Sequence, residues 1–148
     1  MSLELFSLAG KTALITGSSR GLGRAFAEGL AAAGATVILN GTNSERLSQA
    51  CKEMSDAGMK VDMSLFDVTD EAAIKAAFDR FDTAGIQIDI LINNAGIQFR
   101  KPMLELDTAD WQRVIDTNLT SAFMIGREAA KRMVKRGHGK IVNIGSLT

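Results

Sequence analysis

The sequence predicts an α/β fold, a Rossmann-type open parallel sheet of about five strands with helices on both faces. Short apolar, β-branched runs alternate with longer segments of helical periodicity along all 148 residues. Several helical segments end at a glycine, the residue best suited to a left-handed helix terminus. Because regular strand–helix alternation gives βαβ units with right-handed crossovers, we expect every strand to run parallel.

The five predicted strands are apolar at nearly every position, which is typical of parallel strands covered on both faces. They are Thr12–Thr16, Thr36–Asn40, Val61–Phe66, Asp89–Asn93 and Lys140–Gly145. The helices between them are predicted over Leu22–Ala33, Ser44–Ala57, Asp70–Ala84 and one long segment that begins after Asp107 and continues to about Arg136. Thr69 is expected to cap the third helix, and Gly34, Gly58 and Gly85 to end the first three.

Composition restricts the class of protein. Hydrophobic residues make up 46% and charged residues 23% of the chain, which excludes disordered, collagen-like and coiled-coil proteins. Seventeen basic residues balance seventeen acidic ones, so no global charge attracts the chain to nucleic acid or a membrane surface. No run approaches the ~20 apolar residues of a membrane span, and the start carries Glu4 rather than a basic leader. We expect one cytoplasmic domain over residues 1–148.

A glycine-rich turn joins the first strand to the first helix. Its spacing from Thr16 to Gly23 is G-x-x-x-G-x-G, which provides a tight turn, close backbone approach and helix–strand packing at a helix N-terminus. Those are the requirements of a pyrophosphate cradle, although glycines that only make a sharp turn are the alternative. The expected cofactor-binding residues here are Gly17, Ser19, Arg20, Gly21, Leu22 and Gly23.

The second strand ends Asn40-Gly41-Thr42, without the carboxylate that would hold a ribose 2′-hydroxyl. Arg20 lies in the preceding loop, and a guanidinium beside an uncharged strand end favours the 2′-phosphate of NADP over NAD. We therefore expect Asn40 and Thr42 to line the cofactor site. The alternative is a solvated loop cation beside a plain turn.

The third and fourth strand ends add further candidates. Asp67-Val68 follows the third strand, where Asp67 either hydrogen-bonds an adenine amino group or helps to start the next helix beside Thr69. The fourth strand ends in an Asn-Asn-Ala-Gly run, whose amides can bridge main chains and whose small residues allow a ribose to approach. The expected cofactor contacts in that run are Asn94, Ala95 and Gly96.

The long helix carries one polar residue of interest. Asn118 falls in an apolar stripe made of Trp111, Val114, Ile115, Ala122, Phe123, Ala129 and Met133. It is either a satisfied core amide or an asparagine that opens the helix locally and holds a water for proton transfer. His138 is predicted to be a loop residue away from the strand ends, and Cys51 a small buried hydrophobe. No cluster has metal-ligand spacing, so we predict no metal.

These motifs, in this order, resemble the short-chain dehydrogenase/reductase family over the whole chain, with Ser146 closing the fifth strand. The resemblance implies that Ser146 steadies the substrate, that Asn118 holds a proton-relay water and that nicotinamide carries the hydride. The family's acid/base is a tyrosine in a Tyr-x-x-x-Lys pair after the serine. This chain contains no tyrosine, so we expect a Rossmann domain that lacks the carboxy-terminal part of the family fold and is inactive by itself.

Within the family, the chain's opening residues and the stretch from Asn93 to Arg100 resemble gluconate 5-dehydrogenases, with Arg100 placed to bind a sugar-acid carboxylate or else exposed in a loop. Related members of the NADP type carry arginine where this chain has Thr42. Two alternatives remain: a 3-oxoacyl-carrier-protein reductase and a non-catalytic nucleotide-binding module. The resemblance also implies a homo-oligomer, a dimer or tetramer, with the long helix at the subunit interface.

Overall fold

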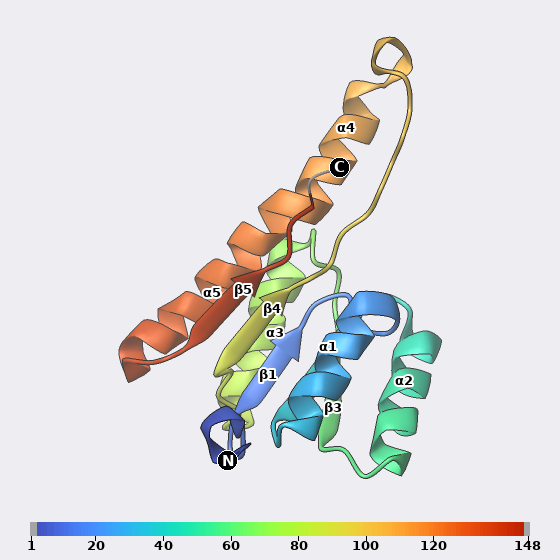
Figure 1. Cartoon of the computed structure of the whole chain (residues 1–148). Coiled ribbons are helices and arrows are strands. Elements are labelled where there is room, and N and C mark those ends of the chain that lie inside the picture. The colour runs from blue at the N-terminus through green and yellow to red at the C-terminus, as the bar shows by residue number, and fades with distance from the viewer. Residues whose placement is uncertain (1–2, 147–148) are drawn as a thin grey trace.

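A computed structural model describes residues 3–146 and confirms the predicted architecture, a five-stranded parallel sheet with helices on both faces (Figure 1). The strand order is β3-β2-β1-β4-β5. The strands are β1 (Thr12–Ile15), β2 (Thr36–Gly41), β3 (Val61–Leu65), β4 (Ile90–Asn93) and β5 (Lys140–Asn143). Because β4 returns to the far side of β1, the order reverses there and opens a crevice at the carboxyl ends of β1 and β4.

The helices follow the predicted order. They are α1 (Gly21–Ala32), α2 (Ser44–Asp56), α3 (Glu71–Thr83), α4 (Thr108–Ile115) and α5 (Ser121–Arg136), with short 3₁₀ turns η1 (Leu3–Phe6) and η2 (Met103–Glu105). Gly34, Gly58 and Gly85 have φ of +102°, +82° and +69°, which confirms the predicted left-handed termini. The cap predicted for α3 is wrong, because Asp70 rather than Thr69 accepts the bond from the backbone N–H of Ala73, at 3.0 Å.

Two hydrophobic cores lie on opposite faces of the sheet. Successive strand residues point to opposite sides, so Leu14 packs with residues of α3 and α5 while Ala13 and Ile15 pack with residues of α1 and α2. Phe78 is fully buried on the first face and Leu47 on the second. Cys51, predicted to be buried, is partly buried and packs against the second core, and burial raises the pKa of its thiol.

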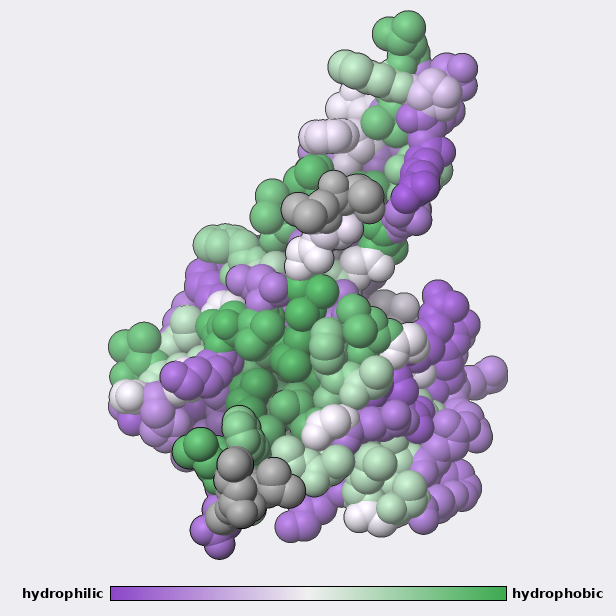
Figure 2. Space-filling view, viewed as in Figure 1, coloured by the Kyte–Doolittle hydropathy of each residue, from purple (hydrophilic) through white to green (hydrophobic). Residues whose placement is uncertain are grey.

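The prediction that every strand is covered on both faces is wrong for the two edge strands. Asp62, Met63 and Leu65 of β3 are exposed, and so is every residue of β5. A hydrophobic area overlies β5 and the neighbouring strands on the face shown in Figure 2. An apolar strand sequence therefore identified a strand but did not determine how well that strand is covered.

The long predicted helix is two α-helices joined by a π-helical turn, η3 (Asp116–Thr120). In Figure 1, α4 extends α5 well past the end of the sheet. The predicted stripe is partly wrong, because Trp111 and Phe123 are 55% and 61% exposed, and Asn118 is exposed as well. The residues of α5 that face the core include Met124, Ile125, Ala129 and Met133.

Candidate functional site

A cavity of about 840 Å³ lies at the carboxyl ends of the strands, where the topology places the crevice. The predicted residues that line it come from four strand ends: Gly17, Ser19, Arg20, Asn40, Thr42, Asp67, Val68, Asn94, Ala95 and Gly96. The structure thus brings together residues nearly eighty positions apart in the sequence. Gly21, Leu22 and Gly23, which were also predicted, form the first turn of α1 and are not among the residues that line the cavity.

At two of its three glycines, Gly17 and Gly23, the glycine-rich loop leaves no room for a side chain. Gly17 has a φ of +62°, and a Cβ there would lie 2.9 Å from the Cα of Ala95. A Cβ on Gly23 would lie 2.5 Å from both the carbonyl oxygen of Gly17 and the Nδ2 of Asn94. The loop is therefore pressed against the end of β4, and α1 begins at Gly21 without a side-chain cap on its N-terminal N–H groups. Uncapped N–H groups at a glycine turn favour an anion such as a pyrophosphate.

The buried side chains of Thr16 and Asn40 and the partly buried side chain of Asn94 tie this loop to the neighbouring strands. The Asn94 amide donates to the carbonyls of Thr16 and Gly17 at 3.0 and 3.1 Å, and Thr16 Oγ1 accepts from the backbone N–H of Asn94 at 3.0 Å. The Asn40 amide accepts from the N–H of Gly17 at 3.2 Å and donates to the carbonyls of Ser64 and Phe66, both at 3.1 Å. Since the Asn40 amide is 1% exposed and fully engaged, it holds the loops in place.

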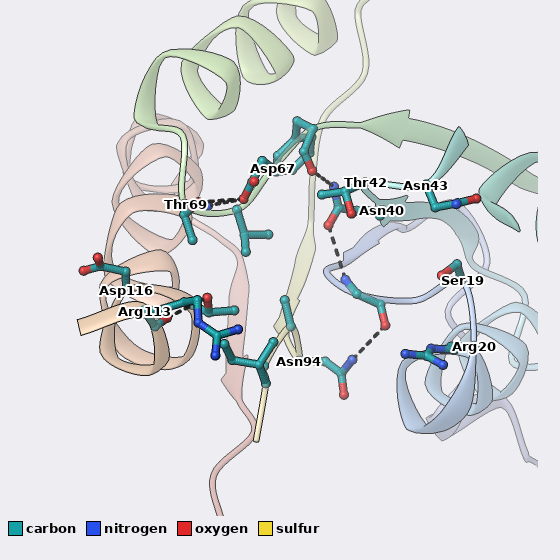
Figure 3. A pocket seen from close by; sticks show the side chains of 18 of the residues that line it. Ser19, Arg20, Asn40, Thr42, Asn43, Asp67, Thr69, Asn94, Arg113 and Asp116 are labelled. Atoms are coloured by element: carbon teal, nitrogen blue, oxygen red, sulfur yellow. Dashed lines mark hydrogen bonds between the residues drawn. The ribbon is translucent and has the colours of Figure 1, made fainter. Parts of the chain in front are cut away.

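Asp67 performs the turn-forming role that the sequence allowed. Its Oδ1 accepts from the backbone N–H and from the hydroxyl of Thr69, both at 2.8 Å. The same residue lines the cavity and faces it in Figure 3, so the adenine contact stays a prediction.

One wall of the cavity, opposite the strand ends, was not predicted from the sequence. It comes from α4 and η3 and includes Ala109, Gln112, Arg113, Asp116 and Thr117. The position of this wall depends on how the helix passes over the sheet, which no local motif encodes. A further residue that was missed, Arg46, lines the cavity from the first turn of α2.

Asn118 forms a clamp rather than a core contact. Its Oδ1 accepts from the backbone N–H of Ile97 at 2.8 Å, and its Nδ2 donates to the carbonyl of Ile97 at 2.9 Å. It sits in the π-helical turn, where the N–H of Ser121 bonds to the carbonyl of Asp116, five residues earlier. The prediction of a buried amide is therefore wrong, whereas the predicted local opening of the helix at Asn118 is confirmed.

Arg100 and Ser146 are exposed and lie outside the cavity lining formed by the described residues. With the Gln98 amide turned so that its oxygen faces Arg100, that oxygen accepts from Nε at 3.2 Å and from Nη2 at 2.9 Å. The backbone just before Ser146 is fixed by the N–H of Ile144, which donates to the carbonyl of Asn93 at 3.0 Å. Both residues thus follow the carboxyl ends of adjacent strands, β4 and β5.

His138, the single histidine of the sequence, lies away from the cavity. His138 is at the opposite edge of the sheet, with its Nδ1 3.6 Å from Asp89 Oδ1, as the predicted loop position requires. No group of three metal-ligating side chains occurs among residues 3–146. Within the same range, no helix has the length and apolarity needed to cross a membrane.

Comparisons with known proteins agree with this geometry. The family model for short chain dehydrogenases matches residues 11–148. Gluconate 5-dehydrogenase from Gluconobacter oxydans is 46% identical over 144 residues, which are 97% of this chain and 56% of that protein. A structure from Agrobacterium tumefaciens, provisionally described as a gluconate dehydrogenase, has 68% identity and a TM-score of 0.95, covering 96% of this chain and 56% of that one.

A second solved structure carries a cofactor. It is a gluconate 5-dehydrogenase from Burkholderia cenocepacia in complex with NADP and tartrate, 42% identical with a TM-score of 0.93. It covers 99% of this chain and 57% of that one. The chain therefore spans a little over half the length of the proteins it matches.

Proposed function

Because the chain belongs to the short-chain dehydrogenase family, we propose that the whole protein is an NADP-dependent oxidoreductase that interconverts a hydroxyl and a ketone on a sugar acid. The observation that carries the proposal is the glycine-rich loop packed against the end of β4 beneath a cavity of about 840 Å³. The relatives named above favour a sugar acid over a 3-oxoacyl thioester.

The residues present fit the cofactor. The space that a Cβ would fill at Gly17 and Gly23 is space that loop backbone needs for close approach to a pyrophosphate. Arg20 lines the cavity beside the end of β2, where Asn40, Gly41 and Thr42 carry no negative charge. A 2′-phosphate is therefore attracted there and not repelled, which supports NADP over NAD.

When bound, the nicotinamide supplies or accepts the hydride. We assign to Ser146 the role of donating a hydrogen bond to the substrate oxygen. The side chain of Asn118 is committed to Ile97, so its role is to fix the π-helical turn. A π-helical turn widens the backbone and exposes carbonyl oxygens, which is where we place the proton-relay water.

Turnover tests the proposal. A longer form that continues through a Tyr-x-x-x-Lys segment should oxidise NADPH with 5-ketogluconate, whereas the 148-residue chain, which has no tyrosine, should show none. The measurement is NADPH absorbance at matched, mass-verified concentrations of the two forms. Comparable turnover by the short form would refute these roles. If the longer form reduced only a 3-oxoacyl thioester, the substrate class would be wrong, and NADP binding without turnover on either substrate would indicate a binding module.

Arg100 is proposed to bind the substrate carboxylate, with the Gln98 oxygen holding its guanidinium. In the longer form, Arg100→Ala should raise the KM for 5-ketogluconate about tenfold to a hundredfold, the loss expected for a charge-assisted contact. A neutral ketose serves as the internal control, since its KM should hardly change. An unchanged KM for the acid would show that Arg100 is only an exposed loop cation.

The outer side of α4, η3 and α5 supports the proposal of a homo-oligomer. Trp111, Leu119 and Phe123 are 55%, 64% and 61% exposed there and do not contribute to the core. Exposed apolar side chains of this size are typical of a subunit interface. Light scattering at micromolar concentration should give the mass of a dimer or tetramer, and a monomer mass would contradict the proposal.

A further inference from the structure

The end of the cavity beside β2 carries two guanidinium groups without counter-charges. Arg20 and Arg46 both line the cavity, and neither forms an ion pair within residues 3–146. Arg113, which lines the opposite wall, is different. It pairs with Asp110 at 3.4 Å and lies over the Phe99 ring, 5.1 Å from its centroid. The two unpaired arginines are thus concentrated at one end.

The two segments that carry these arginines, the β1–α1 loop and the start of α2 after β2, are held together. The N–H of Ser18 donates to the carbonyl of Asn40 and the N–H of Asn40 donates to Ser18 Oγ, both at 2.9 Å. A Cβ added to Gly41 would come within van der Waals distance of Ser19 Oγ, at 3.6 Å, so the end of β2 lies close to the β1–α1 loop. Arg20 follows Ser19 directly, and the backbone of Arg46 is positioned by its N–H, which donates to Asn43 Oδ1 at 2.8 Å.

The negative charges of the cavity lie elsewhere. Figure 3 shows Arg20 beside Ser19 on one side and Asp116 on the other, with Asp67 between them at the end of β3. Asp67 Oδ1 is taken by Thr69, and Asp116 Oδ1 accepts from Gln112 at 2.8 Å. At the arginine end, Thr42 offers a hydroxyl but no charge. A doubly charged anion bound there would lie near the positive charges of Arg20 and Arg46. The β2–α2 turn provides no carboxylate that would repel it.

We propose that Arg46 is a specificity-determining residue that binds the 2′-phosphate of NADP together with Arg20. The inference rests on the proposed function, because only a bound dinucleotide brings a 2′-phosphate to the end of β2. A guanidinium from the β1–α1 loop and one from the first turn of α2 can bond different oxygens of one phosphate. Arg46 then discriminates NADP from NAD, since the two cofactors differ only in that group.

Calorimetry on the purified chain tests this, with NADP, NAD and adenosine 2′,5′-bisphosphate as ligands. Arg46→Ala should weaken binding of NADP and of the bisphosphate about tenfold and change NAD affinity less than about twofold, because one charge-assisted phosphate contact is lost. Arg46→Lys should restore part of the loss, since lysine keeps the charge without the fork geometry. Arg80→Ala is the matched control, because Arg80 is exposed on α3 and outside the cavity lining.

The possible results distinguish a failure of the role of Arg46 from a failure of the proposed cofactor site. An unchanged NADP affinity in Arg46→Ala, with a clear loss in Arg20→Ala, would overturn the role of Arg46 and leave the proposed function standing. Equal losses for NADP and NAD would also overturn it, since a general effect on the loop would explain them. If the unsubstituted chain bound neither cofactor, both the inference and the proposed cofactor site would fall. The thermal unfolding midpoint of each variant confirms that it is folded.

Discussion

The loops around the nucleotide cavity and the segment that follows β4 are constrained to very different degrees. Around the cavity, the side chains of Thr16, Asn40 and Asn94 are each hydrogen-bonded to backbone on a neighbouring strand or loop. Between β4 and α4, Met103 and Leu104 are 88% and 99% exposed. This segment is tied to the helix by the Asn118 clamp on Ile97 and by Arg113, which lies over the Phe99 ring. The first region is fixed by its own contacts, whereas the second meets little of the rest of the chain.

From this difference we expect the proposed nucleotide binding and the proposed substrate chemistry to respond separately to substitution. The cradle is completed by β1, β2 and β4 with their loops, all within the described chain. The proposed substrate residues Arg100 and Ser146 lie on exposed backbone.

The largest effect is expected in the cradle. Gly23→Ala places a Cβ 2.5 Å from the carbonyl oxygen of Gly17, a backbone atom that cannot move without shifting the loop. We expect at least about 2 kcal/mol lower unfolding free energy, the usual cost of overpacking, and loss of measurable NADP binding. Urea denaturation and calorimetry measure the two effects.

Gly29→Ala is the matched control, since it lies in the same helix and a Cβ there meets nothing within 4 Å. It should stabilise the chain by about 0.5–1 kcal/mol, the helix-propensity gain, and leave NADP affinity unchanged. Similar behaviour of the two alanine variants would show that the cradle is not tightly constrained.

A smaller effect is expected at the clamp. Asn118→Ala removes both hydrogen bonds to Ile97, and water can replace them because the site is exposed, so we expect about 1 kcal/mol of lost stability. The sharper readout is amide hydrogen exchange at Ile97, which should accelerate. Asn118→Asp should not rescue it, because one carboxylate oxygen would face the Ile97 carbonyl.

Gln112→Ala provides the comparison for the clamp. It removes a side-chain bond to Asp116 in the same helical segment without touching Ile97. Exchange at Ile97 should stay at its original rate in this variant. If it accelerated as much as in Asn118→Ala, general loosening of the helix would explain the result and the clamp would carry no special role.

The same contrast explains what the sequence could predict. The glycine-rich loop, the strand ends and the opening of the helix at Asn118 follow from local spacing, because glycine and asparagine have specific backbone roles. The cavity wall from α4 and the inward position of Met124 rather than Phe123 depend on how a helix passes over the sheet. Helical periodicity gives the stripe but not its rotation once a π-helical turn shifts the phase.

How far the faces of each strand are covered was also hidden from the sequence. The segment Lys140–Gly145 is predicted to be a strand covered on both faces, yet all four residues of β5 (Lys140–Asn143) are exposed, because which helices overlie a strand depends on the arrangement of the whole chain. The cap of α3 failed for a local reason. Asp67 holds the N–H and hydroxyl of Thr69 in a turn, which leaves Asp70 to cap the helix.

Where α5 packs against α3, the nearly buried carboxylate of Glu128 belongs to the ion-pair network that links the two helices. The side chain of Glu128 is 10% exposed and accepts from Lys131 at 2.5 Å and from Arg132 at 3.0 Å. Arg132 also bonds Asp82 of α3, at 2.7 Å. The bonds from Lys131 and then Arg132 hold the pKa of Glu128 below its usual value, against the opposing effect of burial.

A carboxyl group whose pKa is lowered by folding stabilises the protein above its unfolded pKa, and this contribution is lost as pH falls through the folded pKa. Glu128→Gln should therefore lower the unfolding free energy by about 0.5–1 kcal/mol near neutral pH, and the gap should narrow at about pH 4 and below. Urea titrations at several pH values measure that gap. Glu105→Gln, an exposed carboxylate on η2, should show no comparable change, since its charge has no partner among the described ion pairs. If the difference in unfolding free energy between the two forms stayed constant with pH, side-chain packing at Glu128, and not its charge, would stabilise the contact between α5 and α3.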